Sequence, residues 1–254
     1  TKSGFTLVNA GESPTITITA STKAGTTSAI TVNPAGLNDF TVVPSTYSPT
    51  TDSGFTVTLT ARDVYQNTKT DYTSTHSVAW SWATGGSASP KGSSATLASD
   101  GNQTFTAGVS SAISGFKLVK TETATITATA DTKSGTSTTI TAGPGALNNF
   151  TLTTQHSGTE TAGTSFSVTA TARDAEWNTK TDYTGSQSVV WTWSATNAPS
   201  GASPTKPADA SETFTSGAMT KSGFTLVNAG ESPTITITAS TKSGTTSAVT
   251  VNPA

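Results

Sequence analysis

Residues 55–73 read FTVTLTARDVYQNTKTDYT, and residues 166–184 read FSVTATARDAEWNTKTDYT. Over the first seven positions of each stretch, apolar residues alternate with Thr or Ser. This period of two is typical of a β-strand that buries one face. The inward-facing residues are then Phe55, Val57, Leu59 and Ala61. The Asp-x-x-x-Asn pattern that follows predicts a turn, because Asp and Asn side chains hydrogen-bond nearby backbone groups.

Repeats organise the whole chain. Residues 1–35 recur as residues 220–254 and differ only at Ala24/Ser243 and Ile30/Val249. Within this period of 219 residues lies a weaker repeat of about 110 residues, which makes the two strand-and-turn stretches equivalent. We therefore expect part of a preceding repeat in residues 1–35, one domain in residues 36–145 and another in residues 146–254. Residues 1–35 should hold only the last two strands of a repeat, which cannot bury a core alone, so the array is expected to continue at both ends.

Further segments with the same alternation predict more strands. They lie at residues 15–20, 78–82, 125–130, 189–193 and 234–239. Ser134-Gly135 and Ser243-Gly244 are expected to form the turns between the last two strands of each unit. No stretch of ten residues shows the apolar spacing of a helix. About seven short strands per unit, separated by turn signals, predict an all-β chain of tandem immunoglobulin-like β-sandwich domains.

The segment from Ala162 to Gly185, with its counterpart from Asp52 to Ser74, resembles the bacterial immunoglobulin-like repeats of extracellular surface proteins of the invasin, intimin and filamin-like type. In that pattern an alternating strand leads into a D-x-x-x-N turn and then a T-x-Y-T-G edge. The resemblance implies a surface-exposed tandem-domain protein of bacterial or archaeal type. The chain departs from the pattern at Gln66 and Trp177, where a Gly usually precedes the Asn.

The Asp and Asn residues of the turn are the first candidates for a binding site. They place several oxygen ligands close together in each unit, where Ca²⁺ could bind. The other interpretation is that Asp and Asn hydrogen-bond the turn and that Arg62 or Arg173 neutralises the carboxylate. We favour this second interpretation and expect no cofactor, because a calcium loop normally supplies more carboxylates. The candidate ligands are Asp63, Asn67, Asp71, Asp174, Asn178 and Asp182.

Five tryptophans divide into two groups. Trp80, Trp82, Trp191 and Trp193 lie at alternating positions of strands and are expected in the cores, where immunoglobulin-like folds keep a central Trp. Trp177 lies in the turn, and its counterpart in the first unit is Gln66. An exposed aromatic side chain there could contact a neighbouring domain or subunit, stack on a sugar, or simply pack over the loop.

Composition argues against several classes of function. Thirteen basic and 15 acidic residues give a net charge of −2, so the basic surface that binds nucleic acid is absent. The longest apolar runs are too short for membrane insertion of this segment. Neither His76 nor His156 occupies an equivalent repeat position or adjoins a recognisable nucleophile, so we expect no enzyme activity.

These observations predict an extracellular, cell-surface structural protein that forms a stalk, sheath or filament from tandem or strand-complemented immunoglobulin-like domains. Sparse Lys and Pro leave the strand edges unprotected, which favours self-association into a fibre or a longer tandem array. The alternative is an adhesin or a carbohydrate-binding surface module that uses glycans as partners. Strand donation between subunits and a continuous longer chain would both complete residues 1–35.

Overall fold

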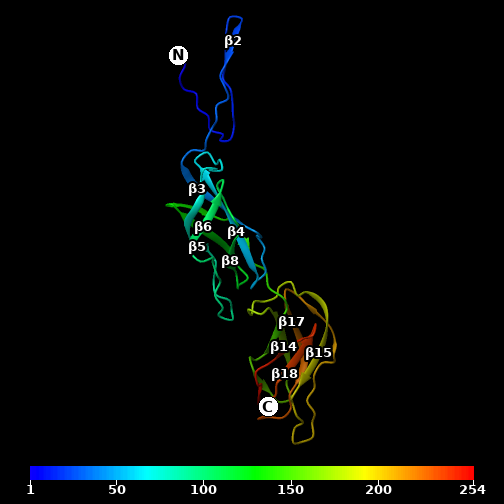
Figure 1. The fold of residues 1–254 in the computed structure, drawn as a ribbon. Helices are drawn as coiled ribbons and strands as arrows, with labels where there is room; N and C mark the ends of the chain where they lie inside the picture. The colour runs from blue at the N-terminus through cyan, green and yellow to red at the C-terminus, as the bar shows by residue number, and fades with distance from the viewer.

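The structure is a computed structural model that describes residues 1–254. It contains strands and no helix. Two β-rich bodies follow one another along the chain, and the N-terminal residues project from the first of them (Figure 1). We call residues 36–145 unit A and residues 146–254 unit B.

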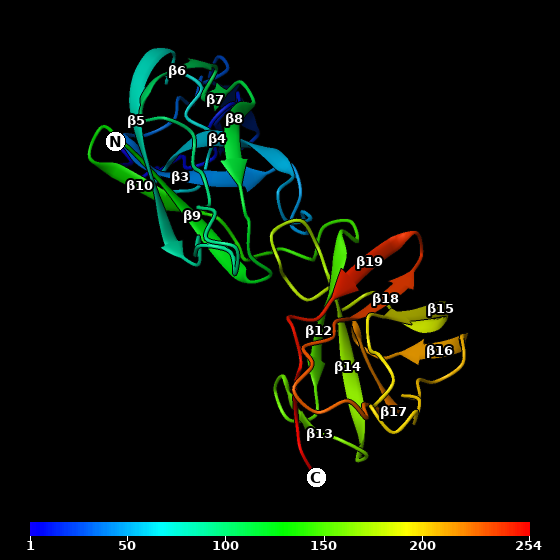
Figure 2. The same ribbon diagram turned by 90° about the horizontal axis from the view of Figure 1, so that it is seen from below.

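Unit B is a sandwich of two antiparallel sheets, which separate clearly in Figure 2. One sheet has the order β12-β14-β17 and the other the order β16-β15-β18-β19. Two further strands, β13 and β20, pair in parallel. The strands are β12 (Asn149–Thr154), β13 (Thr159–Thr161), β14 (Ser165–Arg173), β15 (Gly185–Trp193), β16 (Ala210–Phe214), β17 (Ala218–Thr225), β18 (Ile235–Ala239), β19 (Lys242–Thr245) and β20 (Thr250–Asn252).

Unit A repeats this plan. Its strand β4 pairs with β3 and β8, and β5 pairs with β6 and β9. The strands are β3 (Leu37–Pro44), β4 (Gly54–Asp63), β5 (Ser74–Thr84), β6 (Gly101–Thr106), β7 (Val109–Ser110), β8 (Ile113–Lys117), β9 (Thr123–Ala130), β10 (Lys133–Thr136) and β11 (Ile140–Thr141). Each unit therefore has more strands than the seven predicted, because edge strands of two to four residues add to the main ones.

Each unit has its own core. The alternating residues of β4 are all buried, as predicted: Phe55, Val57, Leu59 and Ala61. Equivalent aromatic pairs recur, since Phe55 stacks on Phe116 and Phe166 on Phe224 with ring centroids 5.9 and 5.8 Å apart. Neither core cluster includes a residue before position 37. Both units are immunoglobulin-like β-sandwiches.

Residues 1–35 form only a hairpin of β1 (Thr17–Ala20) and β2 (Lys23–Thr26). Phe5 is 67% exposed, whereas its copy Phe224 in unit B is 0% exposed. Ile18 is likewise exposed and its copy Ile237 buried. The same sequence therefore lies in a core in one place and presents that face to solvent in the other.

The prediction that residues 1–35 correspond to two final strands is wrong. Their copy, residues 220–254, runs through the end of β17 and then β18, β19 and β20. Strands β17 and β18 lie in different sheets of the sandwich. A missing partner would therefore have to complete both layers around residues 1–35.

The predicted position of the hairpin turn is also wrong. The turn between β9 and β10 is Asp131-Thr132, and both residues have positive φ, of 47° and 63°. Ser134 and Gly135 lie inside β10 instead. An added Cβ at Gly135 would lie 1.8 Å from the carbonyl oxygen of Phe40 on β3, so glycine is needed where these two strands meet.

Gly135→Ala should therefore destabilise unit A, by about 1–3 kcal/mol or more, because the backbone of β3 must move away. Gly25, the equivalent residue in the N-terminal segment, has no atom within 4 Å of an added Cβ. Gly25→Ala is the matched control and should leave the urea midpoint of the chain unchanged. Equal effects of the two substitutions would contradict this assignment.

Candidate functional site: the joints between units

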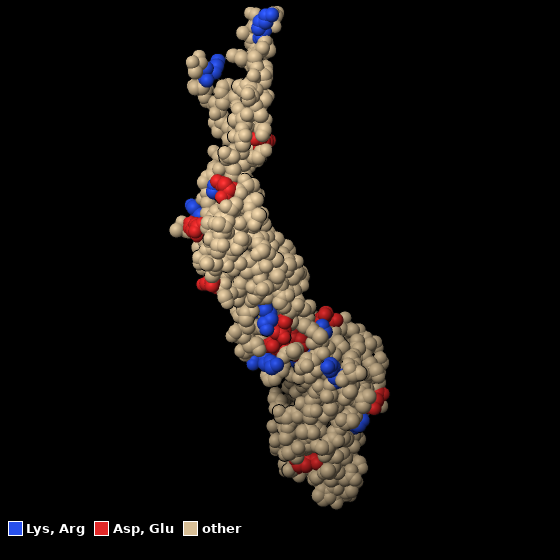
Figure 3. Space-filling view, viewed as in Figure 1, with Lys and Arg blue, Asp and Glu red and all other residues tan.

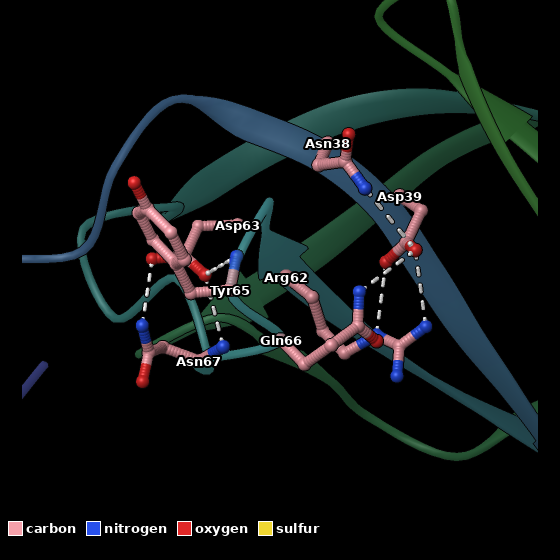
Figure 4. A network of polar contacts seen from close by, with 7 residues as sticks. All are labelled: Asn38, Asp39, Arg62, Asp63, Tyr65, Gln66 and Asn67. Carbon is pink, nitrogen blue, oxygen red and sulfur yellow. Dashed lines mark hydrogen bonds and ion pairs between the residues drawn. The ribbon is translucent and has the colours of Figure 1, made fainter. Parts of the chain in front are cut away.

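The loop after β4 is a closed turn built around the carboxylate of Asp63. Its Oδ1 accepts hydrogen bonds of 2.9 Å from the backbone N–H groups of Tyr65 and Asn67 (Figure 4). Gln66 closes the turn at a φ of 68°, and the equivalent Trp177 has a φ of 65°. Both residues therefore adopt the left-handed conformation of the Gly that the family pattern has at this position.

The same two side chains also bind the preceding segment. Asp63 Oδ2 accepts the N–H of Ala35 at 3.0 Å, and Asn67 Nδ2 donates to the carbonyl of Val8 at 2.7 Å. Asn67 Oδ1 accepts the N–H of Ala10 at 3.2 Å. Asp63 and Asn67 thus connect unit A to both ends of residues 1–35.

An equivalent joint connects unit A to unit B. Asp174 Oδ2 accepts the hydroxyl of Thr51 at 2.5 Å and the N–H of Gly145 at 3.0 Å. Asn178 donates to the carbonyl of Val119 at 2.9 Å and accepts the N–H of Thr121 at 3.1 Å. Since Val119 and Thr121 are the counterparts of Val8 and Ala10, the turn performs the same connection at each joint. We call this contact the A–B joint.

These hydrogen bonds set the pKa values of both carboxyl groups. Burial alone would raise the pKa of Asp174, but hydrogen bonds from Thr51, Gly145 and Asn178 outweigh it and lower the pKa below its ordinary value. Burial opposes the same shift at Asp63, where hydrogen bonds from Asn67, Ala35 and Tyr65 lower the pKa. Both groups are therefore held as carboxylates.

The lowered pKa predicts acid sensitivity. Because the folded chain holds Asp174 ionised more strongly than the unfolded chain does, its contribution is complete above the unfolded pKa of about 3.9. It is lost as the pH falls through the lowered folded pKa. Asp174→Asn should therefore destabilise unit B at pH 7 and progressively less toward pH 3, as measured by urea unfolding. A difference that stays constant over this range would contradict the assignment.

A second contact across the A–B joint was not predicted. The Glu176 side chain is buried, and its Oε2 accepts the hydroxyl of Ser89 at 2.7 Å. The Lys91 ammonium donates to the carbonyl of Ala175 at 3.1 Å. The loop of residues 87–93 in unit A thus covers the turn of unit B. Figure 3 shows charged side chains gathered where the two units meet, on a surface that otherwise carries few of them.

The predicted metal ligands do not converge. Both oxygens of Asp63 already accept N–H donors, including Asn67 Nδ2 at 2.9 Å. Asp71 pairs with Lys69 at 2.9 Å instead, as Asp182 does with Lys180. No group of three or more His, Cys, Asp or Glu side chains is placed to hold a metal ion.

Chelation should therefore leave the thermal midpoint of the chain unchanged, and added Ca²⁺ should not raise it. A ligand that binds only the folded state stabilises it. Thermal unfolding in EDTA and in millimolar CaCl₂ checks this expectation. A midpoint that rises with Ca²⁺ would restore the calcium interpretation.

The predicted role of the arginines is wrong. Arg62 forms its ion pair with Asp39, at 2.9 Å, and not with Asp63 (Figure 4). Arg173 donates to Thr151 and Thr179, at 3.0 and 2.8 Å. Neutral N–H and hydroxyl donors, rather than a guanidinium, therefore satisfy the buried turn carboxylates.

The strand tryptophans lie where the cores are. Trp80 and Trp191 are buried and pack edge-on against Phe116 and Phe224. Trp82 and Trp193 are partly buried against the same cores. Trp177 is 49% exposed on the rim of an open hollow of about 500 Å³, while its neighbours Ala175 and Glu176 form the hydrogen bonds across the joint.

The two histidines have unlike surroundings. His76 stacks on Tyr72 and pairs with Asp131 at 2.8 Å. His156 pairs with the buried Glu160 at 2.7 Å. Each imidazole thus bonds a carboxylate within its own unit.

Comparisons with known proteins identify similar structures. Similar solved structures include the FdeC adhesin of Escherichia coli (20% identity, 89% of this chain and 69% of that one, TM-score 0.40) and the Yersinia pseudotuberculosis adhesin InvE (18%, 83% and 58%, 0.36). Another is invasin, a bacterial integrin-binding protein (14%, 94% and 45%, 0.40). This chain spans about half the length of the last two. No protein-family model and no curated protein sequence matches the chain. None of its segments forms a helix long and apolar enough to cross a membrane.

Proposed function

We propose that this chain is a segment of a cell-surface structural protein, in which immunoglobulin-like units join end to end into a stalk, sheath or filament. One observation carries the proposal: residues 1–35 expose the face that their copy, residues 220–254, buries in unit B. The exposed side chains include Phe5, Leu7 and Ile18, and an exposed apolar patch marks a surface that another part of an assembly covers. The strands that would cover it are those of a further unit.

The two joints support an extended arrangement. At each, an Asp and an Asn of the following unit bind the linker and a loop of the preceding one. A linker with its backbone N–H bound in this way is less free to bend than a solvated one. Units added in this way would repeat one geometry and increase the length. The location at a cell surface is proposed from the sequence resemblance.

Residues 1–35 can be completed in two ways. A longer continuous chain would place a full unit before them. In a filament of separate subunits, they would instead enter the unit B of a neighbouring copy in place of its residues 220–254. In the second way residues 1–35 would form the same core contacts as residues 220–254, because only two of the 35 positions differ. It corresponds to strand donation between subunits.

Electron microscopy of the native material, together with its intact mass, tests the proposal. We expect filaments or stalks with an axial repeat of about 70–90 Å, as two sandwiches of ten-residue strands would give. A mass far above 25.5 kDa would indicate one continuous chain, and a mass near 25.5 kDa would indicate separate subunits. Isolated globular monomers would refute the structural role.

A second candidate is a carbohydrate-binding surface module. The observation that favours it is the half-exposed Trp177 at the hollow, whose other lining residues include Thr151, Ser243 and Thr245. An aromatic face beside hydroxyl groups suits a sugar ring. Glycan-array binding that is lost in Trp177→Gln, the residue of unit A at this position, would support this candidate. A blank array with the unaltered chain would count against it.

A further inference from the structure

Unit A has an uncovered apolar patch at the end that faces residues 1–35. Val64 is 58% exposed and Tyr65 is 53% exposed, and Figure 4 shows the Tyr65 ring projecting from the Asp63 turn. Their counterparts in unit B are Ala175 and Glu176. Glu176 is buried because the 87–93 loop of unit A covers it. The equivalent cover is missing over Tyr65.

We propose that residues 198–202 of a preceding copy of unit B cover Val64 and Tyr65, in a second type of joint that alternates with the A–B joint. We call it the B–A joint. The proposal rests on the end-to-end arrangement proposed above, and it names the surfaces that meet. The partner is a second copy of this chain, or of its repeat in a longer one.

Half of this joint is already present in the structure. Residues 1–35 are the copy of residues 220–254, so the carbonyl of Val8 and the N–H groups of Ala10 and Ala35 correspond to those of Val227, Ala229 and Ala254. Asp63 and Asn67 bind these groups of Val8, Ala10 and Ala35. What the N-terminal segment lacks is the loop that precedes this region in unit B.

Shared backbone hydrogen bonds identify that loop. In unit A the N–H of Ser89 donates to the carbonyl of Ser93, and in unit B the N–H of Ala198 donates to that of Ala202. Residues 198–202 are therefore the counterpart of the loop that covers Glu176. They leave unit B at the end away from unit A, as a yellow hairpin in Figure 1.

The end of unit A that meets unit B and the free end of unit B differ in their polar side chains, and each suits a different partner turn. The end of unit A that meets unit B is polar, because Ser89 and Thr51 donate hydroxyl groups to Glu176 and Asp174. At the free end of unit B both hydroxyls are replaced by methyl groups, of Ala198 and Ala162. The ion pair of Lys117 with Asp52, 2.7 Å long, is likewise absent there, since the counterparts are Thr225 and Gly163.

An end without these hydroxyl donors and without this ion pair therefore faces the apolar Val64-Tyr65, and a hydroxyl-bearing end faces the carboxylate of Glu176. The reverse combination is unfavourable. Ala198 placed over Glu176 would bury a carboxylate without its hydroxyl donor. The residues at the joints thus favour strict alternation of the two units and oppose contact between two units of the same kind.

Spin-label distances across each joint test the proposal. The chain has no Cys, so labels attach only where Cys is introduced. The exposed equivalents Ser81 and Thr192 give a label pair across the A–B joint. The B–A joint is measured in a chain of residues 1–254 followed directly by a second copy of residues 36–254. Its label sites are Thr192 of the first copy and Ser81 of the second. This fusion reproduces the natural Pro-Ala-Gly linker, and both cores lie within residues 37–251.

We expect a narrow distance distribution across the B–A joint, as narrow as that across the A–B joint. Tyr65→Glu in the second copy should abolish the narrow peak, and Ala198→Ser in the first copy should restore it by supplying the hydroxyl donor. A broad B–A distribution beside a narrow A–B distribution would overturn this inference alone. So would a narrow peak that survives Tyr65→Glu. Broad distributions at both joints would instead refute the proposed stalk or filament.

Discussion

Phe224→Ala should lower the free energy of unfolding of unit B by about 3–5 kcal/mol, the usual loss when a buried Phe is truncated in a core. Phe224 is fully buried between two aromatic rings. Its ring centroid lies 5.8 Å from that of Phe166 and 5.1 Å from that of Trp191. Such a loss is a large part of the stability of a domain of this size.

Phe5→Ala is the matched control, because Phe5 occupies the same position of the repeated sequence but is exposed. In the isolated chain it should change the urea midpoint of neither unit. Urea unfolding followed by Trp fluorescence measures both variants. Equal destabilisation by the two variants would mean that residues 1–35 are already packed in the isolated chain, contrary to the structure.

Asp174→Ala should destabilise unit B by about 3 kcal/mol or more, because each buried donor left without an acceptor costs about 1–3 kcal/mol. The carboxylate is the acceptor for the backbone N–H groups of Glu176 and Asn178, both at 2.9 Å, and for the hydroxyl of Thr51. The variant should also widen the distance distribution across the A–B joint, since Asp174 binds the linker at Gly145.

Asp182→Ala provides the control for charge alone. Asp182 is exposed and pairs only with Lys180, so its removal should cost less than about 1 kcal/mol. The comparison requires urea unfolding and the label pair at Ser81 and Thr192. A rigid joint in Asp174→Ala would show that the linker is held by something other than this carboxylate.

The alternating strands made the fold readable from the sequence. In Phe55 to Ala61 a period of two selects one face, and burial of that face requires a second sheet. The long internal repeat made residues 1–35 recognisable as a part of a unit. Both inferences depend on patterns within a strand or between copies, which a sequence displays directly.

Contacts between distant segments could not be read in this way. Glu176 bonds Ser89, which lies 87 positions away in the sequence, and no local pattern in either loop predicts this contact. Gly135 resembles a turn residue, yet it lies in a strand because the backbone of Phe40 approaches it closely. The turn is formed instead by Asp131-Thr132, since Asp tolerates the left-handed conformation.

The candidate site was found in part. Asp63 and Asn67 were correctly identified as residues that hydrogen-bond the turn, but the hydrogen bonds they form to the preceding unit were missed. A signal for these was present in the sequence. The Asp and Asn recur in both units while the residues between them change from Val-Tyr-Gln to Ala-Glu-Trp. The constant Asp and Asn fit the linker contact that both joints share. The variable residues between them fit the two different units that precede unit A and unit B.

The most direct test of the account is hydrogen exchange of residues 1–35 in the native material and in the isolated chain. Ala24/Ser243 and Ile30/Val249 give the two copies peptides of different mass. In native material the peptides that contain Ala24 and Ile30 should be as protected as those that contain Ser243 and Val249. In the isolated chain only the latter should be protected. Free exchange of residues 1–35 in the native material would show that no further unit covers them, and it would contradict the account.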